Sequence, residues 1–257
     1  QIPVEIWHLK TAYKKNWGRM PQVLSRIKQA RDRGLDITAD IYPYIAGSTA
    51  LSASLPPWAQ EGGVEKMLAR LRDPQMRRRI LADMPSDAEI EKLAQFRQVV
   101  AKQFDKFFIM GNPPDYEPGP EKSVAAIAQR EDRAPEEVAY DYMLEEGQYL
   151  YFPVVNYTTG DHGPILEMLH DPACLLGLSD GGAHCTSIID AGVPTYMLTH
   201  WGRDRARGPK FPLEKLVKRQ TSETADFFGL TDRGRLEPGL RADINVIGFD
   251  RLGTRKP

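Results

Sequence analysis

Apolar residues along this chain fall into short, strand-like runs. Residues 174–178 (CLLGL) are continuously apolar, with Asp171-Pro172 before them and a glycine pair after them. Such a run is typical of a fully buried strand in a parallel sheet. Residues 4–9, 36–44 and 149–156 are rich in β-branched and aromatic residues, and they predict three more strands.

The segments between these runs have helical periodicity. After the first strand, Val23, Leu24, Ile27 and Ala30 recur at helical spacing, and Gly34 supplies a C-terminal stop. Comparable amphipathic patterns predict helices at 63–71, 74–84, 123–129, 135–146, 160–170, 212–220 and 222–228.

Alternating strands and helices indicate a parallel α/β fold, and four such strands amount to half of an eight-stranded barrel. The small-residue stretch 46–49 is expected to be a loop, and 242–247 a final strand. The chain opens at Gln1 in strand-like sequence, without a starting Met or a signal peptide. We therefore expect it to be a piece of a longer polypeptide.

Composition narrows the class of protein. A chain of 257 residues can bury a sizeable core, and barrels of this length occur as one domain. The formal net charge of −1 gives no overall field that would attract nucleic acid or acidic lipid. No apolar run approaches the length of a membrane span. Two cysteines make no disulfide framework, which favours a cytoplasmic location.

Asp180 is the first candidate catalytic residue. It follows the predicted strand 174–178 and precedes two glycines, which let a ligand approach the backbone closely. In a βα barrel, a carboxylate at the C-terminal end of a strand occupies the position of catalytic groups. An Asx-turn or a helix cap explains an Asp before Gly equally well, so the local residues leave both interpretations open.

Other reactive side chains have structural explanations. His8 ends the first strand, where a lone histidine is more often a core or surface residue than a ligand. We expect His162 and His170 to be solvated at the edges of a helix, and His200 to pack within one. The three arginines at 77–79 predict a solvated helix face rather than a phosphate site.

Three motifs, kept in order along the chain, carry a resemblance to a known family. They are residues 40–49 (DIYPYIAGST), 178–184 (LSDGGAH) and 233–243 (RGRLEPGLRAD). Together they resemble the N-acyl-D-amino-acid deacylases, or D-aminoacylases, of the amidohydrolase superfamily. The last motif is shared across the superfamily and therefore indicates only the superfamily. The tyrosine-proline-tyrosine strand, combined with Ser-Asp-Gly-Gly, narrows the resemblance to the deacylase branch. The resemblance covers nearly the whole chain and is least clear at 95–120.

The resemblance implies a TIM-like (β/α)8 metal-hydrolase barrel with a small β-sandwich. The chain would be the C-terminal half, with barrel strands 5–8 in residues 1–230 and a helical insertion around 62–147. Residues 231–257 would supply the terminal strand of the β-sandwich.

The resemblance also implies a zinc site. By similarity, His8 is a metal ligand at the end of the fifth barrel strand, and Asp180 is a metal ligand and catalytic residue at the end of the eighth. Neutral imidazole binds Zn²⁺ well, and zinc lowers the pKa of its water to ~7. Asp180 can take the proton from that water and deliver it to the leaving amine. The side chains implied to contact the substrate are Lys10, Tyr42, Ser48 and His184.

Two kinds of metal ligand that are common in the superfamily do not occur in this sequence. None of the five histidines forms a His-x-His pair, and residues 36–44 contain no histidine. His8 and Asp180 are fewer than the three protein ligands that a catalytic zinc normally keeps. Cys185 is better explained as inert packing than as a substitute ligand. We therefore expect this polypeptide alone to bind zinc poorly and to have little activity.

The resemblance implies zinc-dependent hydrolysis of the amide bond of N-acyl-D-amino acids, giving a carboxylate and a D-amino acid. The expected partner is this small-molecule substrate, with no nucleic acid and no membrane. A hydantoinase-like cyclic amide hydrolase and a catalytically inactive scaffold stay open as alternatives. The unpaired edges of a half-barrel favour a homo-oligomer. A nucleotide-binding domain is disfavoured because no G-x-G-x-x-G follows a strand.

Overall fold

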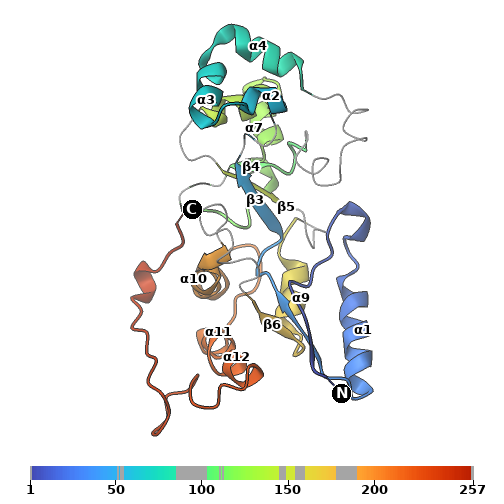
Figure 1. Ribbon diagram of the computed structural model, residues 1–257, viewed down its shortest axis with the longest axis vertical. Helices are drawn as coiled ribbons and strands as arrows, with labels where there is room; N and C mark the ends of the chain where they lie inside the picture. Colours follow the sequence, from blue (N-terminus) through green and yellow to red (C-terminus); the bar gives the residue numbers. More distant parts are fainter. Residues whose placement is uncertain are drawn as a thin grey trace. The chain divides into compact units, whose positions relative to one another are not determined.

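A computed structural model describes residues 2–50, 52, 55–84, 103–109, 111, 113–144, 149–153, 160–177 and 190–255. The chain divides into two compact units (Figure 1). Unit 1 comprises Gln1–Ile45, Asn112–Glu117 and Val155–Pro257, and unit 2 comprises Ala46–Gly111 and Pro118–Val154. Each unit is therefore assembled from segments that are distant in the sequence.

A three-stranded parallel sheet forms the centre of unit 1 (Figure 1). Ala39 and Ile41, on its middle strand, are fully buried, whereas Asp40 between them is only half-buried. Because successive side chains of a strand point to opposite faces, Asp40 lies on the face away from Ala39 and Ile41. The strands, in spatial order, are β1 (Val4–Ile6), β2 (Ile37–Ile41) and β6 (Cys174–Leu176).

Two helices pack near this sheet. Helix α1 (Met20–Asp32) has Pro21 in its first turn and contacts β2. Ile27 and Ala30 are buried on α1, which confirms the helix predicted from the spacing of these apolar residues. Helix α9 (Gly163–His170) contacts both β6 and α1. Its buried residues are Pro164, Ile165, Met168 and Leu169.

The C-terminal part of unit 1 is helical up to residue 227. Trp201 is fully buried in this part, and its indole N–H donates to the Pro43 carbonyl at 2.9 Å. Arg219 donates from its guanidinium to the carbonyls of Leu169 and Cys174, which ties its helix to β6. Besides the sheet and the helices α1 and α9, the described part of unit 1 contains further helical elements. They are η1 (Lys14–Asn16), η4 (Asp190–Gly192), α10 (Val193–Tyr196), the π-helix η5 (Met197–Asp204), α11 (Leu213–Gln220), α12 (Ser222–Phe227) and η6 (Phe249–Arg251).

Unit 2 combines a small antiparallel sheet with a group of helices. The sheet has the order β3 (Ala46–Ala50), β5 (Tyr149–Pro153), β4 (Phe108–Ile109). The buried Tyr140 hydroxyl donates to the Leu71 carbonyl at 2.7 Å, which joins two of the helices across the core. The helical elements are α2 (Pro57–Gln60), α3 (Val64–Arg72), α4 (Pro74–Ala82), η3 (Pro120–Lys122), α7 (Val124–Glu131) and α8 (Pro135–Met143).

The arginines at 77–79 lie on α4. Arg78 and Arg79 are exposed, as expected of a solvated helix face. Arg77 is half-buried, donates to Asp141 at 2.5 Å and stacks over the Tyr140 ring. Asp73 caps the same helix by accepting from the backbone N–H groups of Gln75 and Met76. The cluster is thus a structural feature of unit 2.

The structure corrects one loop prediction and the pairing of one predicted strand. Residues 46–49, expected to be a loop, form most of β3. The strand expected at 149–156 is β5, which pairs antiparallel with β3 and β4 and not with the parallel sheet. The described parallel sheet therefore has three strands and not four. Pairing partners decide such assignments, and small residues fit a strand when a neighbouring strand supplies the hydrogen bonds.

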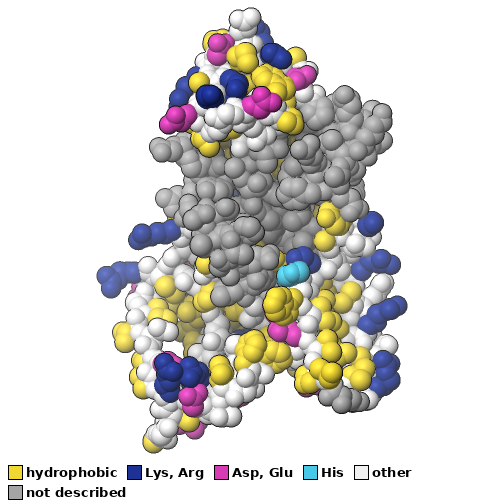
Figure 2. All heavy atoms as spheres, in the orientation of Figure 1, with side chains coloured by type: hydrophobic (Ala, Val, Ile, Leu, Met, Phe, Trp, Pro, Cys, Tyr) yellow, Lys and Arg dark blue, Asp and Glu magenta, His cyan; other side chains and the backbone are white. Residues whose placement is uncertain are grey.

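The strand expected at 242–247 does not form within the described residues. Ile244 is 61% exposed and Val246 is 98% exposed, so this apolar pattern has no sheet to pack against. A single strand cannot satisfy its own backbone groups, which explains the difference. Figure 2 shows further hydrophobic side chains at the surface near the N-terminal strand, beside basic side chains along the adjoining edge. None of the described helices is long and apolar enough to cross a bilayer.

Candidate functional site

The strands β1 and β2 end beside one another, at the edge where parallel α/β sheets bind ligands. His8 follows β1 with a φ of 42°, in the left-handed region that costs a non-glycine residue about 1 kcal/mol or more. Asp40 stabilises this turn. Its side chain accepts from the His8 backbone N–H, and its carbonyl accepts from the Leu9 N–H at 2.8 Å.

Three residues predicted from the sequence to contact metal or substrate meet at this edge. Lys10 Nζ lies 3.2 Å from His8 Nδ1 and 3.5 Å from the Tyr42 hydroxyl. The Lys10 ammonium also lies 4.6 Å from the centre of the Tyr42 ring, and the His8 and Tyr42 rings stack with centroids 6.2 Å apart. An imidazole, a cation and a phenol therefore form one group at the ends of β1 and β2.

Asp40 is a residue of this edge that sequence reasoning missed. An added Cβ at Gly177, which follows β6, would lie 2.5 Å from Asp40 Oδ2. The carboxylate thus fits between the His8 backbone and a glycine of the neighbouring strand. The alternation of Ala39, Asp40 and Ile41 was the available signal, because it predicts a polar side chain opposite two buried ones.

The other predicted site residues are not brought together by the described structure. Asp180, His184 and Cys185 lie outside the described residues. Ser48 lies on β3 in unit 2, where it pairs with Tyr151, and its side chain is not described. Their assigned roles stay predictions.

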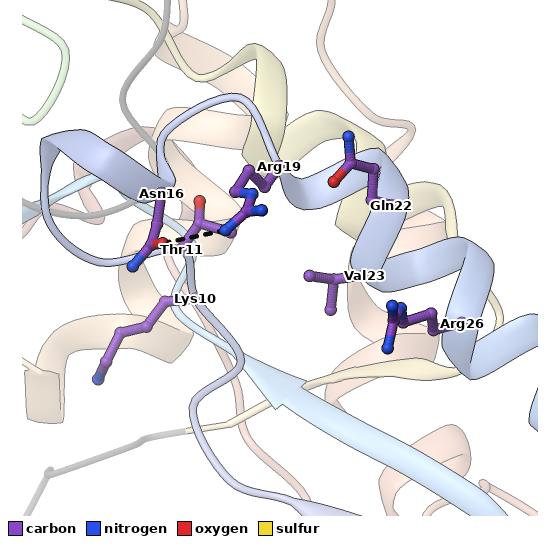
Figure 3. Close-up of a pocket in the computed structure, with 7 residues that line it drawn as sticks. All are labelled: Lys10, Thr11, Asn16, Arg19, Gln22, Val23 and Arg26. Carbon is purple, nitrogen blue, oxygen red and sulfur yellow. Dashed lines mark hydrogen bonds between the residues drawn. The ribbon is translucent and has the colours of Figure 1, made fainter.

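A cavity of about 410 Å³ lies between the loop after β1 and helix α1 (Figure 3). Arg26 lies on α1 and Arg19 immediately precedes it, and both side chains are exposed. In Figure 3 the Lys10 side chain extends away from Arg26, in agreement with its contacts to His8 and Tyr42. The remaining lining residues are Thr11, Asn16, Gln22 and Val23.

A second polar group in unit 1 is almost completely buried. Glu117 forms a bidentate pair with Arg205, in which Nε donates to Oε2 and Nη2 donates to Oε1, each at 3.0 Å. His200 Nε2 lies 3.0 Å from Oε2, and the His162 backbone N–H donates to Oε1 at 2.9 Å. The side chains of Glu117, Arg205 and His162 are at most 3% exposed.

Charge in this buried group is balanced by the ion pair. Burial alone would raise the pKa of Glu117, but hydrogen bonds from His200 and Arg205 hold it far below its usual range. Burial lowers the pKa of His162 to about 3, against the opposing attraction of Glu117. At neutral pH the group therefore contains a carboxylate, a guanidinium and a neutral His162 imidazole.

Aromatic rings connect the buried group to the strand-end group. Tyr196 stacks on His200 with centroids 4.8 Å apart and contacts Tyr44 at 5.9 Å. Tyr44 in turn contacts Tyr42, whose ring stacks on His8. These successive ring contacts restrict the rotamers of His200 at one end and His8 at the other, because packed aromatic rings have few alternative rotamers.

The expectation of a solvated His162 was wrong. His162 is fully buried, stacked on Trp201 and in T-shaped contact with His200. His200 does pack in a helix, η5, but it also reaches Glu117. Sequence reasoning missed this group because Glu117, His162 and Arg205 lie on three distant segments. No local spacing joins them.

Residues 1–257 match the amidohydrolase family along their whole length. The chain belongs to this family. Similar proteins include an N-acyl-D-glutamate deacylase of Alcaligenes xylosoxydans xylosoxydans, 27% identical over 96% of this chain, and an uncharacterised protein of Mycobacterium tuberculosis, 28% identical over 74% of it. The amidohydrolase chain spans 39% and 32% of the lengths of these two relatives.

A solved structure agrees on the fold. The N-acyl-D-glutamate deacylase of Bordetella bronchiseptica, complexed with zinc and a phosphonate inhibitor, matches with a TM-score of 0.51 at 22% identity. The match covers 98% of the amidohydrolase chain and 42% of that structure. The D-aminoacylase resemblance predicted from the sequence is thus confirmed, since a D-aminoacylase 26% identical over 96% of the chain is also among its relatives.

Among the described residues, one place groups three donors that suit a divalent metal, and the strand ends offer a single imidazole. Imidazole and carboxylate are the N and O ligands that zinc prefers, and His8 at the strand ends offers an imidazole. Glu117, His162 and His200 offer three ligand atoms that all lie within 4.8 Å of one another.

Proposed function

We propose that this chain forms part of a metal-dependent hydrolase that cleaves the amide bond of N-acyl-D-amino acids, giving a carboxylate and a D-amino acid. The observation that carries this proposal is the meeting of His8, Lys10 and Tyr42 at the ends of β1 and β2. Three residue types that metal and substrate binding require therefore share one edge in a member of the amidohydrolase family. The deacylases among its relatives support the choice of substrate.

His8 and Asp180 are the proposed metal ligands, and zinc is the proposed metal. When bound, zinc would polarise the scissile carbonyl and lower the pKa of a coordinated water. Asp180 would hold the proton removed from that water and then deliver it to the leaving amine. Asp40 fixes the backbone of His8 at the end of β1 before any ligand arrives.

Lys10 and Tyr42 are the proposed contacts for the substrate carboxylate. An ammonium and a phenol hydroxyl 3.5 Å apart can both donate to one carboxylate, and the charge-assisted bond from Lys10 is the stronger of the two. Ser48 and His184 are proposed to contribute further contacts to the acyl-amino-acid.

For the fold, we propose that β1, β2 and β6 are strands of a (β/α)8 barrel within residues 1–230, with a helical insertion around 62–147. Residues 231–257 would join a β-sandwich, where the exposed pattern at Ile244 and Val246 would find a partner strand. A cytoplasmic location and a homo-oligomeric state are proposed as well.

The test is hydrolysis of paired N-acetyl-D- and N-acetyl-L-amino acids by the full-length product of the gene, before and after zinc is added. We expect turnover of the D series only, and a fall in kcat of about 10²- to 10⁴-fold for Asp180→Asn. His170→Ala, which changes an exposed histidine, is the matched control and should retain full activity. Turnover of cyclic amides instead would favour the hydantoinase-like alternative, and zinc-loaded protein without any turnover would favour the scaffold.

A further inference from the structure

We propose that Glu117, His162 and His200 form a second divalent-metal site, buried in unit 1 and separate from the strand-end ligands His8 and Asp180. The three side chains present two imidazole nitrogens and one carboxylate oxygen within 4.8 Å of one another. Among the described residues they are the one group of three such donors. The three protein donors leave a fourth position of a tetrahedral zinc to water, and the role assigned to this metal is to cross-link the segments that carry them.

His162 is the first argument for a ligand. It is fully buried, and within the described residues neither of its ring nitrogens has a well-aligned hydrogen bond, although the Tyr116 backbone acts to raise its pKa. Buried polar atoms are rarely left unpaired, because the lost hydrogen bonds with water are not replaced. Nδ1 of His162 lies 3.6 Å from Glu117 Oε2. A cation between these atoms would satisfy the nitrogen.

Two of the three separations between donor atoms are close to those of a zinc site. Two ligand atoms of a tetrahedral zinc site lie ~3.3 Å apart, given metal–ligand bonds of 2.0–2.1 Å. The distances from Glu117 Oε2 to His200 Nε2 and His162 Nδ1 are 3.0 and 3.6 Å. Two nitrogens and one oxygen favour zinc or a neighbouring transition metal over Mg²⁺ and Ca²⁺, which prefer oxygen ligands.

Arg205 is compatible with this site. An ionised carboxylate accepts about four hydrogen bonds, and Glu117 receives two from Arg205, one from the His162 backbone and one from His200. A metal would replace only the proton on His200 Nε2 and would leave the other three bonds in place. Arg205 then orients the carboxylate, as outer hydrogen bonds commonly do around metal ligands.

Aromatic contacts fix the orientation of the His162 and His200 imidazoles before a metal binds. His162 stacks on Trp201 with centroids 5.6 Å apart, and His200 stacks on Tyr196 at an interplanar angle of 10°. His200 and Trp201 lie on η5, a π-helix, and such helices are frequent at functional sites. Because the donors come from the segment at 117, the start of α9 and η5, a bound metal would cross-link three distant parts of unit 1.

The test uses the chain with Asp180→Ala, so that the proposed strand-end site is removed and no activity is measured. We expect about one zinc per chain by mass spectrometry after equilibration and desalting. Zinc at 100 times its Kd should raise Tm by about 5–10 °C. Adding His162→Phe, which keeps a ring against Trp201, should abolish both effects.

Two further variants keep the test decisive. His200→Phe removes a donor that is 16% exposed, so it is better tolerated by the fold, and it should also abolish zinc binding. His170→Ala, at an exposed histidine, should leave the zinc content unchanged. Absence of zinc and of a zinc-dependent Tm shift in the Asp180→Ala chain would overturn the proposal. Retention of zinc in a folded His162→Phe or His200→Phe chain would overturn it equally.

Discussion

Lys10 Nζ lies 3.2 Å from His8 Nδ1, at the point where β1 has just ended. An ammonium has only hydrogens to donate, so this contact occupies the lone pair of Nδ1. It leaves the other ring nitrogen, Nε2, carrying the proton of a neutral imidazole. Metal ligation by His8 and its contact with Lys10 therefore exclude one another, and a metal must displace the lysine.

We expect Lys10→Met to raise the zinc affinity of the proposed strand-end site about fivefold. Removing one positive charge a few ångströms from a partly solvated metal is worth on the order of 1 kcal/mol. The measurement is a zinc titration in the His162→Phe background, which removes a ligand of the proposed buried site and leaves the proposed ligands His8 and Asp180. Lys15→Met, at an exposed lysine in η1, is the control. An unchanged affinity in the Lys10 variant would show that the two residues do not compete.

Gly177→Ala is expected to destabilise unit 1 by about 1–3 kcal/mol. The new Cβ would lie 2.5 Å from Asp40 Oδ2, and one of the two residues must move. Urea denaturation measures the change in the free energy of unfolding.

The double variant Gly177→Ala/Asp40→Ala tests this cause. Removing the carboxylate should recover most of the loss, so the double variant should cost less than the sum of the two single changes. Gly253→Ala, where an added Cβ meets nothing within 4 Å, should be nearly neutral. Additive effects at Gly177 and Asp40 would contradict the contact.

Arg205→Met is expected to destabilise the chain by about 3–5 kcal/mol. It leaves the Glu117 carboxylate, 3% exposed, without its cation. Adding Glu117→Gln should restore part of the stability, because the buried charge is then absent. Arg241→Met, which breaks only an exposed pair with Asp243, should change the free energy of unfolding by less than about 1 kcal/mol. A loss of the same size for both arginines would argue against a buried ion pair.

Cys174 is expected to resist alkylation in the folded chain. Its side chain is buried, and burial raises the pKa of the thiol to about 12. Only the thiolate reacts, so the rate should be set by unfolding and should not increase between pH 7 and 9 as an exposed thiol would. Peptide mapping by mass spectrometry distinguishes Cys174 from Cys185.

The raised pKa of Cys174 also makes the free energy of unfolding depend on pH. Because the folded pKa is the higher one, the stabilising contribution of Cys174 is complete below the unfolded pKa and is lost as pH rises from about 9 toward 12. Cys174→Ala should therefore show a smaller loss of stability than the parent chain over this range. Parallel pH profiles for the two chains would contradict the burial of an ionisable thiol.

The sequence by itself determined the local elements and the family. A continuous apolar run identified β6, segments rich in β-branched and aromatic residues identified β1 and β2, and helical spacing identified α1, because each pattern is a local property of the chain. The motifs around Tyr42, Asp180 and Gly239 identified the D-aminoacylase relatives, and they singled out His8, Lys10 and Tyr42 before their contacts were known.

Tertiary structure decided what depends on partners. Residues 46–49 became a strand because β5 supplies the hydrogen bonds, and 242–247 did not because nothing in the described chain pairs with it. Glu117, His162 and Arg205 became one buried group only when three distant segments packed together. Local periodicity records which face of an element is apolar. It does not record which other segment will cover that face, and burial, ion pairing and ligand geometry all follow from that choice.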